Sequence, residues 1–224
     1  MTHQRKSRKF YEEVYRDALE EAFARKPFRR RRLLRAVRLY NEDHYRQALR
    51  ILYRLRRKCR EIADTRAVLL FTGLCYTDMK LPRKATDVYR LLLEIDPWNV
   101  KANNNLGYQL YCMGVYGNAL ELFDRAMTAD PDYAPAYLNT ANCWFRQNDL
   151  DRAMIYAEMA LERDPHATSA MSLLAIVHAL KGNEEEKAEY VHRAVEAGYP
   201  EEKLKQAIRA YQNAQKESER NEEA

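Results

Sequence analysis

Apolar side chains recur along this chain at the spacing that places them on one face of a helix. The first stripe predicts a helix over residues 8–25 and consists of Phe10, Val14, Ala18 and Ala22. Glycine and proline, which punctuate turns, number only 6 and 7 among 224 residues. So few turn residues favour helices over a many-stranded sheet, and the pattern predicts an all-α fold. No apolar run approaches the roughly 18 residues that a membrane-spanning helix needs.

The pattern repeats with a period of 34 residues. The segments EIDPWN, TADPDY and ERDPHA bring their prolines to Pro97, Pro131 and Pro165. Each proline follows, at fixed distances, a small residue (Gly73, Gly107, Ala141), an alanine (Ala85, Ala119, Ala153) and a third position (Tyr89, Phe123, Ala157). This predicts helical hairpins in which the small residue lets two helices approach closely. The aromatic residue is expected to fill the space between repeats, and the proline ends the second helix.

This pattern resembles the tetratricopeptide repeat. Residues 100–133 match its offsets with Leu106, Gly107, Leu110, Ala119, Phe123, Ala126 and Pro131. The resemblance implies an all-helical, right-handed superhelix of about five stacked hairpins, because each hairpin has an apolar face that only a neighbour can bury. The expected array covers residues 29–200, with units at 29–65, 66–99, 100–133, 134–167 and 168–200.

The segments outside the array are expected to cap it. Residues 1–28 form a basic N-terminal segment that contains the entry helix. Residues 201–218 form an exit helix that covers the last unit with polar residues, and residues 219–224 form a disordered acidic tail. Within the first unit, Arg32 and Arg35 fall at core offsets, so its register stays open.

In this repeat family the first helix of each hairpin lines the concave surface. Asn105 and Asn139 occupy equivalent positions, and Asn142 lies one turn beyond Asn139. Side-chain amides both donate and accept hydrogen bonds, so they suit the backbone of an extended peptide. The predicted peptide-binding groove comprises Lys101, Asn104, Asn105, Tyr108, Tyr111, Asn139, Asn142 and Arg146. The alternative is that these asparagines belong to a solvated face with no assigned partner. Asn103, at a core offset, is expected to cap its helix.

Apolar groove positions flank the asparagines on both sides. They are Leu70, Phe71 and Leu74 upstream, and Leu173, Ile176 and Leu180 downstream. Such positions either form exposed interaction patches, which would also join protomers into an oligomer, or are covered by the flanking helices. Leu70 and Leu74 also stand where the carboxylate clamp of heat-shock chaperone adaptors needs Lys and Asn, so the resemblance does not extend to that clamp.

Charge is distributed unevenly along the chain. Residues 1–60 hold 20 Lys and Arg against 7 Asp and Glu, a net charge of +13, whereas residues 61–224 hold 18 against 26, a net charge of −8. One helical stripe in the basic segment comprises Arg46, Arg50, Arg54 and Arg57. Arginine forks bind phosphates, and tyrosines nearby can stack on bases. Three interpretations remain open: a nucleic acid or anionic membrane surface, an acidic protein partner, or no dedicated ligand, with the face either solvated or paired with the acidic C-terminal repeats of the same chain. Membrane insertion is not expected, because the opposite side of this helix has a core to fill.

No catalytic or metal-binding constellation stands out in the sequence. P-loop, GxGxxG, GxSxG and HExxH motifs are absent, and the five histidines share no metal-ligand spacing. The four cysteines are widely spaced and indicate reduced thiols in a cytoplasmic protein. The sequence therefore predicts a scaffold or adaptor that is not an enzyme and needs no cofactor or metal. Its expected ligand is a protein or peptide, with a nucleic acid as the alternative.

Overall fold

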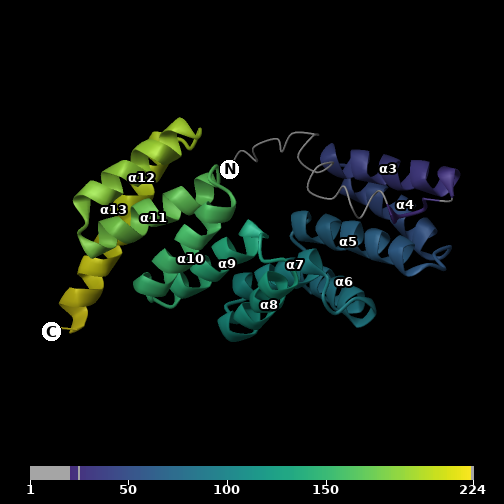
Figure 1. Ribbon diagram of the computed structural model, residues 1–224, viewed down its shortest axis with the longest axis horizontal. Coiled ribbons are helices and arrows are strands. Elements are labelled where there is room, and N and C mark those ends of the chain that lie inside the picture. Colours follow the sequence, from purple (N-terminus) through teal and green to yellow (C-terminus); the bar gives the residue numbers. More distant parts are fainter. Residues whose placement is uncertain (1–20, 25, 223–224) are drawn as a thin grey trace. The chain divides into compact units, whose positions relative to one another are not determined.

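The computed structural model describes residues 21–24 and 26–222 (Figure 1). These ranges hold helices and no strand, which confirms the predicted all-α fold. The helices are α3 (Pro27–Asn41), α4 (Tyr45–Arg56), α5 (Ile62–Asp78), α6 (Pro82–Ile95), α7 (Val100–Cys112), α8 (Tyr116–Ala129), α9 (Ala134–Arg146), α10 (Leu150–Arg163), α11 (Thr168–Lys181), α12 (Glu184–Glu196) and α13 (Glu201–Glu222). The predicted entry helix over residues 8–25 lies almost entirely outside the described residues.

The turns between paired helices recur with the 34-residue period. Lys80, Gly114, Asn148 and Gly182, each 34 residues after the one before, adopt left-handed backbone conformations with φ of 58°, 79°, 61° and 77°. A left-handed residue after the last helical turn satisfies the final carbonyls and reverses the chain. The first hairpin departs from the period, because its left-handed residue, Asp43, precedes Lys80 by 37 residues.

This offset settles the register of the first hairpin. The buried face of α3 consists of Leu33, Ala36, Val37 and Tyr40. Arg32 and Arg35, which the 34-residue register places at core offsets, are exposed instead. The longer spacing between the turns at Asp43 and Lys80 shifts the register of α3, and its arginines therefore lie outside the core.

The chain divides into two compact units, residues 1–113 and 114–224. In the first unit each helix from α3 to α7 packs on the next, and α5 also touches α3 and α7. In the second unit the helices from α8 to α13 pack in sequence, and α11 also touches α9 and α13. Alternate helices therefore lie side by side within each unit, as stacked hairpins require.

Close approach of two helices in the first unit depends on Gly73 of α5. A Cβ atom at this position would lie 2.4 Å from the ring of Tyr89, which is buried on α6. The small residue therefore allows close packing, as predicted. The ring of Tyr89 lies against Gly73 of its own hairpin, and its predicted place between repeats stays a prediction.

The apolar positions predicted to flank the groove are largely covered. Leu70, Phe71 and Leu74 are buried, and the ring of Tyr40 meets Phe71 edge-on with centroids 6.3 Å apart. Downstream, Leu173 is buried, whereas Ile176 and Leu180 are only partly buried. Upstream, the ring on Phe71 comes from α3, inside the expected array, and cover by the helix over residues 8–25 stays a prediction because most of that helix lies outside the described residues. Downstream, α13 packs on α11, which supports cover by the exit helix.

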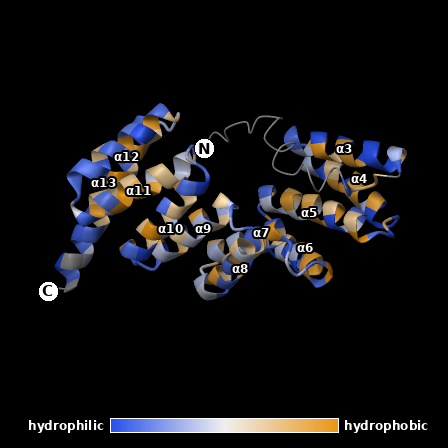
Figure 2. Cartoon of the chain, viewed as in Figure 1, coloured by the Kyte–Doolittle hydropathy of each residue, from blue (hydrophilic) through white to orange (hydrophobic). Residues whose placement is uncertain are grey.

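The exit helix α13 is longer than predicted. It continues to Glu222, so residues 219–222 of the expected disordered tail are helical. No glycine or proline follows residue 200, and the segment is rich in Lys, Gln, Glu and Ala, all strong helix formers. Figure 2 shows α13 as mostly hydrophilic, as expected of a capping helix.

The chain before α3 is fastened to the first unit by a buried carboxylate. Asp64 of α5 is fully buried and accepts a hydrogen bond from the backbone N–H of Phe23 at 2.6 Å. Its second oxygen receives the Lys26 ammonium at 3.0 Å, and the same ammonium pairs with Glu61. Phe23 is itself buried and holds a positive φ of 55°, which a non-glycine residue adopts only when its surroundings enforce it.

The four cysteines are free, and their surroundings differ sharply. Cys75 and Cys143 are fully buried, and loss of hydration raises the pKa of each thiol to about 12. Burial also raises the pKa of Cys59, which is half-buried. Cys112 is exposed.

These differences predict the order of thiol labelling. At pH 8 we expect maleimide to modify Cys112 quickly, Cys59 more slowly, and Cys75 and Cys143 only after unfolding, because only an accessible thiolate reacts. Mass spectrometry with and without urea measures the order of labelling, and Cys112→Ser should remove the fast phase. Fast labelling of Cys75 or Cys143 in the folded protein would contradict their burial.

The buried thiols also make stability depend on pH. Between pH 8.5 and 12 the unfolded chain releases thiol protons that the folded chain keeps, so the free energy of unfolding should fall as pH rises.

Candidate functional site

The residues predicted to line a groove fall into two sets. Lys101, Asn104, Asn105, Tyr108 and Tyr111 belong to α7 in the first unit. The second set, Asn139, Asn142 and Arg146, belongs to α9 in the second unit.

The start of α7 uses its asparagines in different ways. The cap is Asn99, whose Oδ1 accepts the backbone N–H of Ala102 at 2.9 Å, so the prediction that Asn103 caps this helix was wrong. Asn103 is fully buried instead and donates from Nδ2 to the carbonyls of Pro97 and Asn99 at 2.9 and 3.0 Å. It therefore ties α7 to the turn that the proline creates.

The predicted groove residues of α7 differ in accessibility. Asn104 is only 6% exposed, whereas Asn105 is half-buried and its Nδ2 finds no acceptor among the described residues. Tyr108 is 42% exposed and stacks on Tyr111 with centroids 6.1 Å apart. Partial burial, followed by the neighbouring Cys112, raises the pKa of Tyr108 to about 12. Its hydroxyl is therefore a neutral donor at ordinary pH.

On α9 the three predicted residues follow one stripe at positions i, i+3 and i+7. Asn142 is half-buried and donates from Nδ2 to the Leu138 carbonyl at 2.9 Å, while its Oδ1 accepts from no described residue. Arg146 is exposed at the end of the helix, with its Nε 3.5 Å from the Tyr116 hydroxyl. The stripe thus ends in a cation and carries an amide acceptor one turn earlier.

A hollow of about 590 Å³ opens beside this stripe, between the ends of α9 and α11 and the outer half of α13. Phe145 and Tyr211 meet edge-to-face across it, with centroids 5.0 Å apart. Leu150 and Leu180 add apolar surface, and Arg146 adds the charge. The arrangement can accept one large apolar side chain next to an acidic group.

The contribution of α13 to this hollow was missed by the sequence reasoning, which treated the helix only as a polar cap. Gln212 fixes α13 to α11 by donating to the Ala179 carbonyl at 3.2 Å. Tyr211, its neighbour, is the single aromatic residue in the sequence after residue 200 and is 37% exposed. An aromatic residue in an otherwise polar helix was the available signal.

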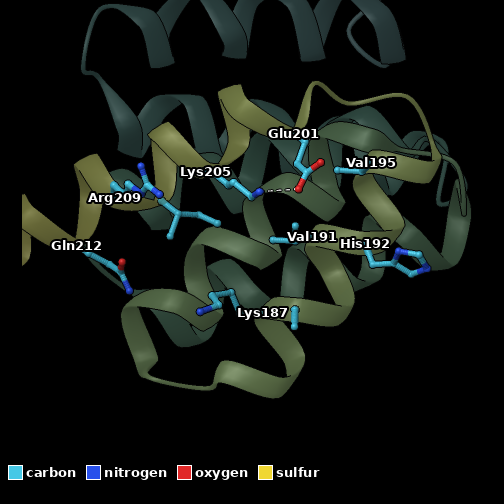
Figure 3. Close-up of a pocket in the computed structure, with 10 residues that line it drawn as sticks. Lys187, Val191, His192, Val195, Glu201, Lys205, Arg209 and Gln212 are labelled. Atoms are coloured by element: carbon cyan, nitrogen blue, oxygen red, sulfur yellow. Dashed lines mark ion pairs between the residues drawn. The ribbon is translucent and has the colours of Figure 1, made fainter.

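A second hollow, of about 550 Å³, lies between α12 and α13 (Figure 3). Its apolar floor includes Val191 and Val195, and Lys205 at its edge points toward Glu201, 2.6 Å away (Figure 3). Lys187 likewise pairs with Glu184. These cations are satisfied within the chain, and none of the predicted site residues lies here.

The predicted anion-binding residues, Arg46, Arg50, Arg54 and Arg57, are all exposed in the first unit. The opposite face of α4 buries Ala48, Leu49, Leu52 and Leu55. Within residues 21–24 and 26–222, no cluster of three or more His, Cys, Asp or Glu side chains is placed to hold a metal ion. None of the helices described there combines the length and apolarity that crossing a membrane requires.

Comparison with known proteins shows which repeat family the sequence resembles. A sequence model of the tetratricopeptide repeat family matches residues 113–175. The RNA polymerase-associated protein CTR9 of Caenorhabditis elegans is 31% identical over 127 residues, which cover 55% of this chain but only 11% of CTR9.

Solved structures share the arrangement of helices. PilF of Pseudomonas aeruginosa is 18% identical with a TM-score of 0.70, and the match covers 79% of each chain. The thermophilic tetratricopeptide repeat protein TTC0263 of Thermus thermophilus is 19% identical with a TM-score of 0.65, covering 81% of this chain and 97% of that one. At these identities the likeness concerns the fold.

Proposed function

The chain belongs to the tetratricopeptide repeat proteins, and from this premise we propose that it is a non-catalytic scaffold that binds an extended peptide on the face formed by α9, α11 and α13. Proteins of this family are generally protein-interaction scaffolds. The observation that carries the proposal is the hollow between Phe145, Leu180 and Tyr211, with Arg146 at its edge.

The chemistry of this face defines the peptide that it suits. The stripe of Asn139, Asn142 and Arg146 runs along α9 toward the hollow. Amides can exchange hydrogen bonds with a peptide backbone whatever its sequence, and the Oδ1 of Asn142 accepts a backbone N–H. One aromatic or large aliphatic side chain fills the hollow, and a carboxylate close to it pairs with Arg146. The ligand is therefore an extended segment with an apolar residue beside an acidic one.

The α7 set supplies a second surface of the same kind in the first unit. Lys101, Asn105, Tyr108 and Tyr111 combine a cation, an amide and two phenol rings, whereas Asn104 contributes less because it is buried. The likeness to CTR9 supports a transcription-associated assembly as the source of the partner.

Selection from a random dodecapeptide library, followed by fluorescence anisotropy with the enriched peptide, tests the proposal. We expect Asn142→Ala combined with Tyr211→Ala to weaken binding at least about tenfold, because both a backbone partner and a wall of the hollow are lost. Ile155→Ala, on the exposed face of α10, is the control and should change the affinity less than about twofold. Failure to enrich any sequence, or equal losses in the two variants, would count against this face as the binding site.

A further inference from the structure

The outward faces of α3 and α4 are covered with arginine. Residues 27–60 contain 12 Arg and 1 Lys against only 2 acidic residues, a net charge of +11. On α3 the residues opposite the core are Arg31, Arg35 and Arg38, and on α4 they are Arg46, Arg50, Arg54 and, just beyond the helix, Arg57. All seven side chains are exposed. Because α3 and α4 pack on each other, the two stripes belong to one hairpin.

This positive charge is not balanced within the first unit. The ion pairs present among its described residues involve Lys26 and Arg66, and none involves an arginine of α3 or α4. The hairpin has only Glu42 and Asp43 as acids, both in its turn. Seven exposed arginines with no ion pair among the described residues of their own unit repel one another, and an anionic ligand would relieve this repulsion.

The spacing of the stripe fits a chain of phosphates. Arg46, Arg50 and Arg54 follow one another by about one helical turn, a rise of roughly 6 Å for four residues. A stretched single strand presents its phosphates at comparable intervals, one for each nucleotide. The guanidinium fork binds phosphate oxygens in pairs, which lysine cannot do, and this segment uses arginine almost exclusively.

Exposed aromatic rings accompany the arginines. Tyr53 lies beside the stripe on α4 and is 51% exposed, while its hydroxyl is held by the hydroxyl of Tyr76. Phe28, at the start of α3, is 80% exposed. The ring of Tyr53, held beside these cations, can serve as a stacking platform for an unpaired base.

We propose that the outer face of the α3–α4 hairpin, defined by its arginine stripes and Tyr53, binds single-stranded nucleic acid. The strand lies along α4 with its phosphates on Arg46, Arg50 and Arg54 and a base on Tyr53. This surface belongs to the first unit and does not depend on the peptide-binding face of α9, α11 and α13.

Fluorescence anisotropy with labelled U20 and dT20, from 50 to 300 mM NaCl, tests the proposal. The stripe variant carries Arg46→Gln, Arg50→Gln and Arg54→Gln. The control carries Arg83→Gln, Arg90→Gln and Arg125→Gln, which removes the same charge from exposed positions on α6 and α8. A labelled 20-residue polyglutamate serves as the acidic peptide.

We expect U20 or dT20 to bind the wild type, and the stripe variant to bind at least about tenfold more weakly at 50 mM salt. The slope of log K against log salt should also shrink by about 2, because three phosphate contacts at about 0.7 each are lost. Tyr53→Leu should weaken binding without changing this slope. Equal losses in the control variant, polyglutamate binding as tightly as either strand, or no binding of U20 and dT20 at 50 mM salt would each overturn the proposal.

Discussion

Gly73→Ala should destabilise the first unit by about 3 kcal/mol, near the upper end of the cost of overpacking a core. The added Cβ would stand 2.4, 2.7 and 2.9 Å from three atoms of the Tyr89 ring. This ring cannot retreat, because it is fully buried and its hydroxyl lies 3.2 Å from the Thr77 hydroxyl. The two helices must therefore move apart, and the packing between α5 and α6 is lost with them.

Urea denaturation followed by circular dichroism measures this effect. Gly117→Ala is the matched control, because its would-be Cβ meets nothing within 4 Å beyond its chain neighbours and the nearby backbone of its own helix. Gly117 lies near the start of α8, so alanine there should stabilise the protein by roughly 0.5 to 1 kcal/mol. Tyr89→Ala combined with Gly73→Ala should cost less than the sum of the single changes, since the clash is absent in the double variant. Equal effects of the two glycine substitutions would contradict the close packing of α5 on α6.

Asp64→Ala should have the second largest effect, a loss of about 2 kcal/mol. The substitution leaves the N–H of Phe23 without an acceptor in a buried site, and it removes one of the two carboxylates that hold Lys26. The hydrogen bond to Asp64 helps to hold Phe23 in its left-handed conformation, so residues 21–24 and Lys26 should detach from α5. Hydrogen exchange at the Phe23 amide measures the detachment directly.

Two variants separate the backbone hydrogen bond from the ion pair. Asp64→Asn keeps an oxygen acceptor for the Phe23 N–H and should retain most of its protection from exchange. Lys26→Met removes the cation and leaves the buried carboxylate without its charged partner, so it should destabilise the protein more than Asp64→Asn. If Asp64→Asn proved as damaging as Asp64→Ala, the backbone bond would not be the main fastening.

The 34-residue period predicted the hairpins because it reflects a local requirement. Each unit must place a small residue, a left-handed turn and a helix stop at fixed distances, and these show in Gly73, Lys80 and Pro97. The first hairpin escaped this reasoning, since its turn at Asp43 is out of phase. Only the buried face of α3 shows which of its arginines are outside.

Features that depend on distant contacts were not predictable in the same way. An aspartate within α5 gave no sign that it binds the N–H of Phe23, 41 residues earlier. Tyr211 stood in a segment that looked like a polar cap, and only its edge-to-face contact with Phe145 reveals the hollow. Asn103 and Asn105 are close in sequence, yet one is a buried structural tie and the other is partly open.

Photocrosslinking of the enriched peptide to the second unit shows whether the hollow beside Arg146 binds it. A p-benzoylphenylalanine residue incorporated in place of Tyr211 lies at the wall of the hollow, whereas one in place of Ile155 lies on the exposed face of α10. We expect the peptide to crosslink from position 211 and not from position 155, and an excess of peptide without the label should abolish the crosslink. Crosslinking from position 155 with none from position 211 would contradict it.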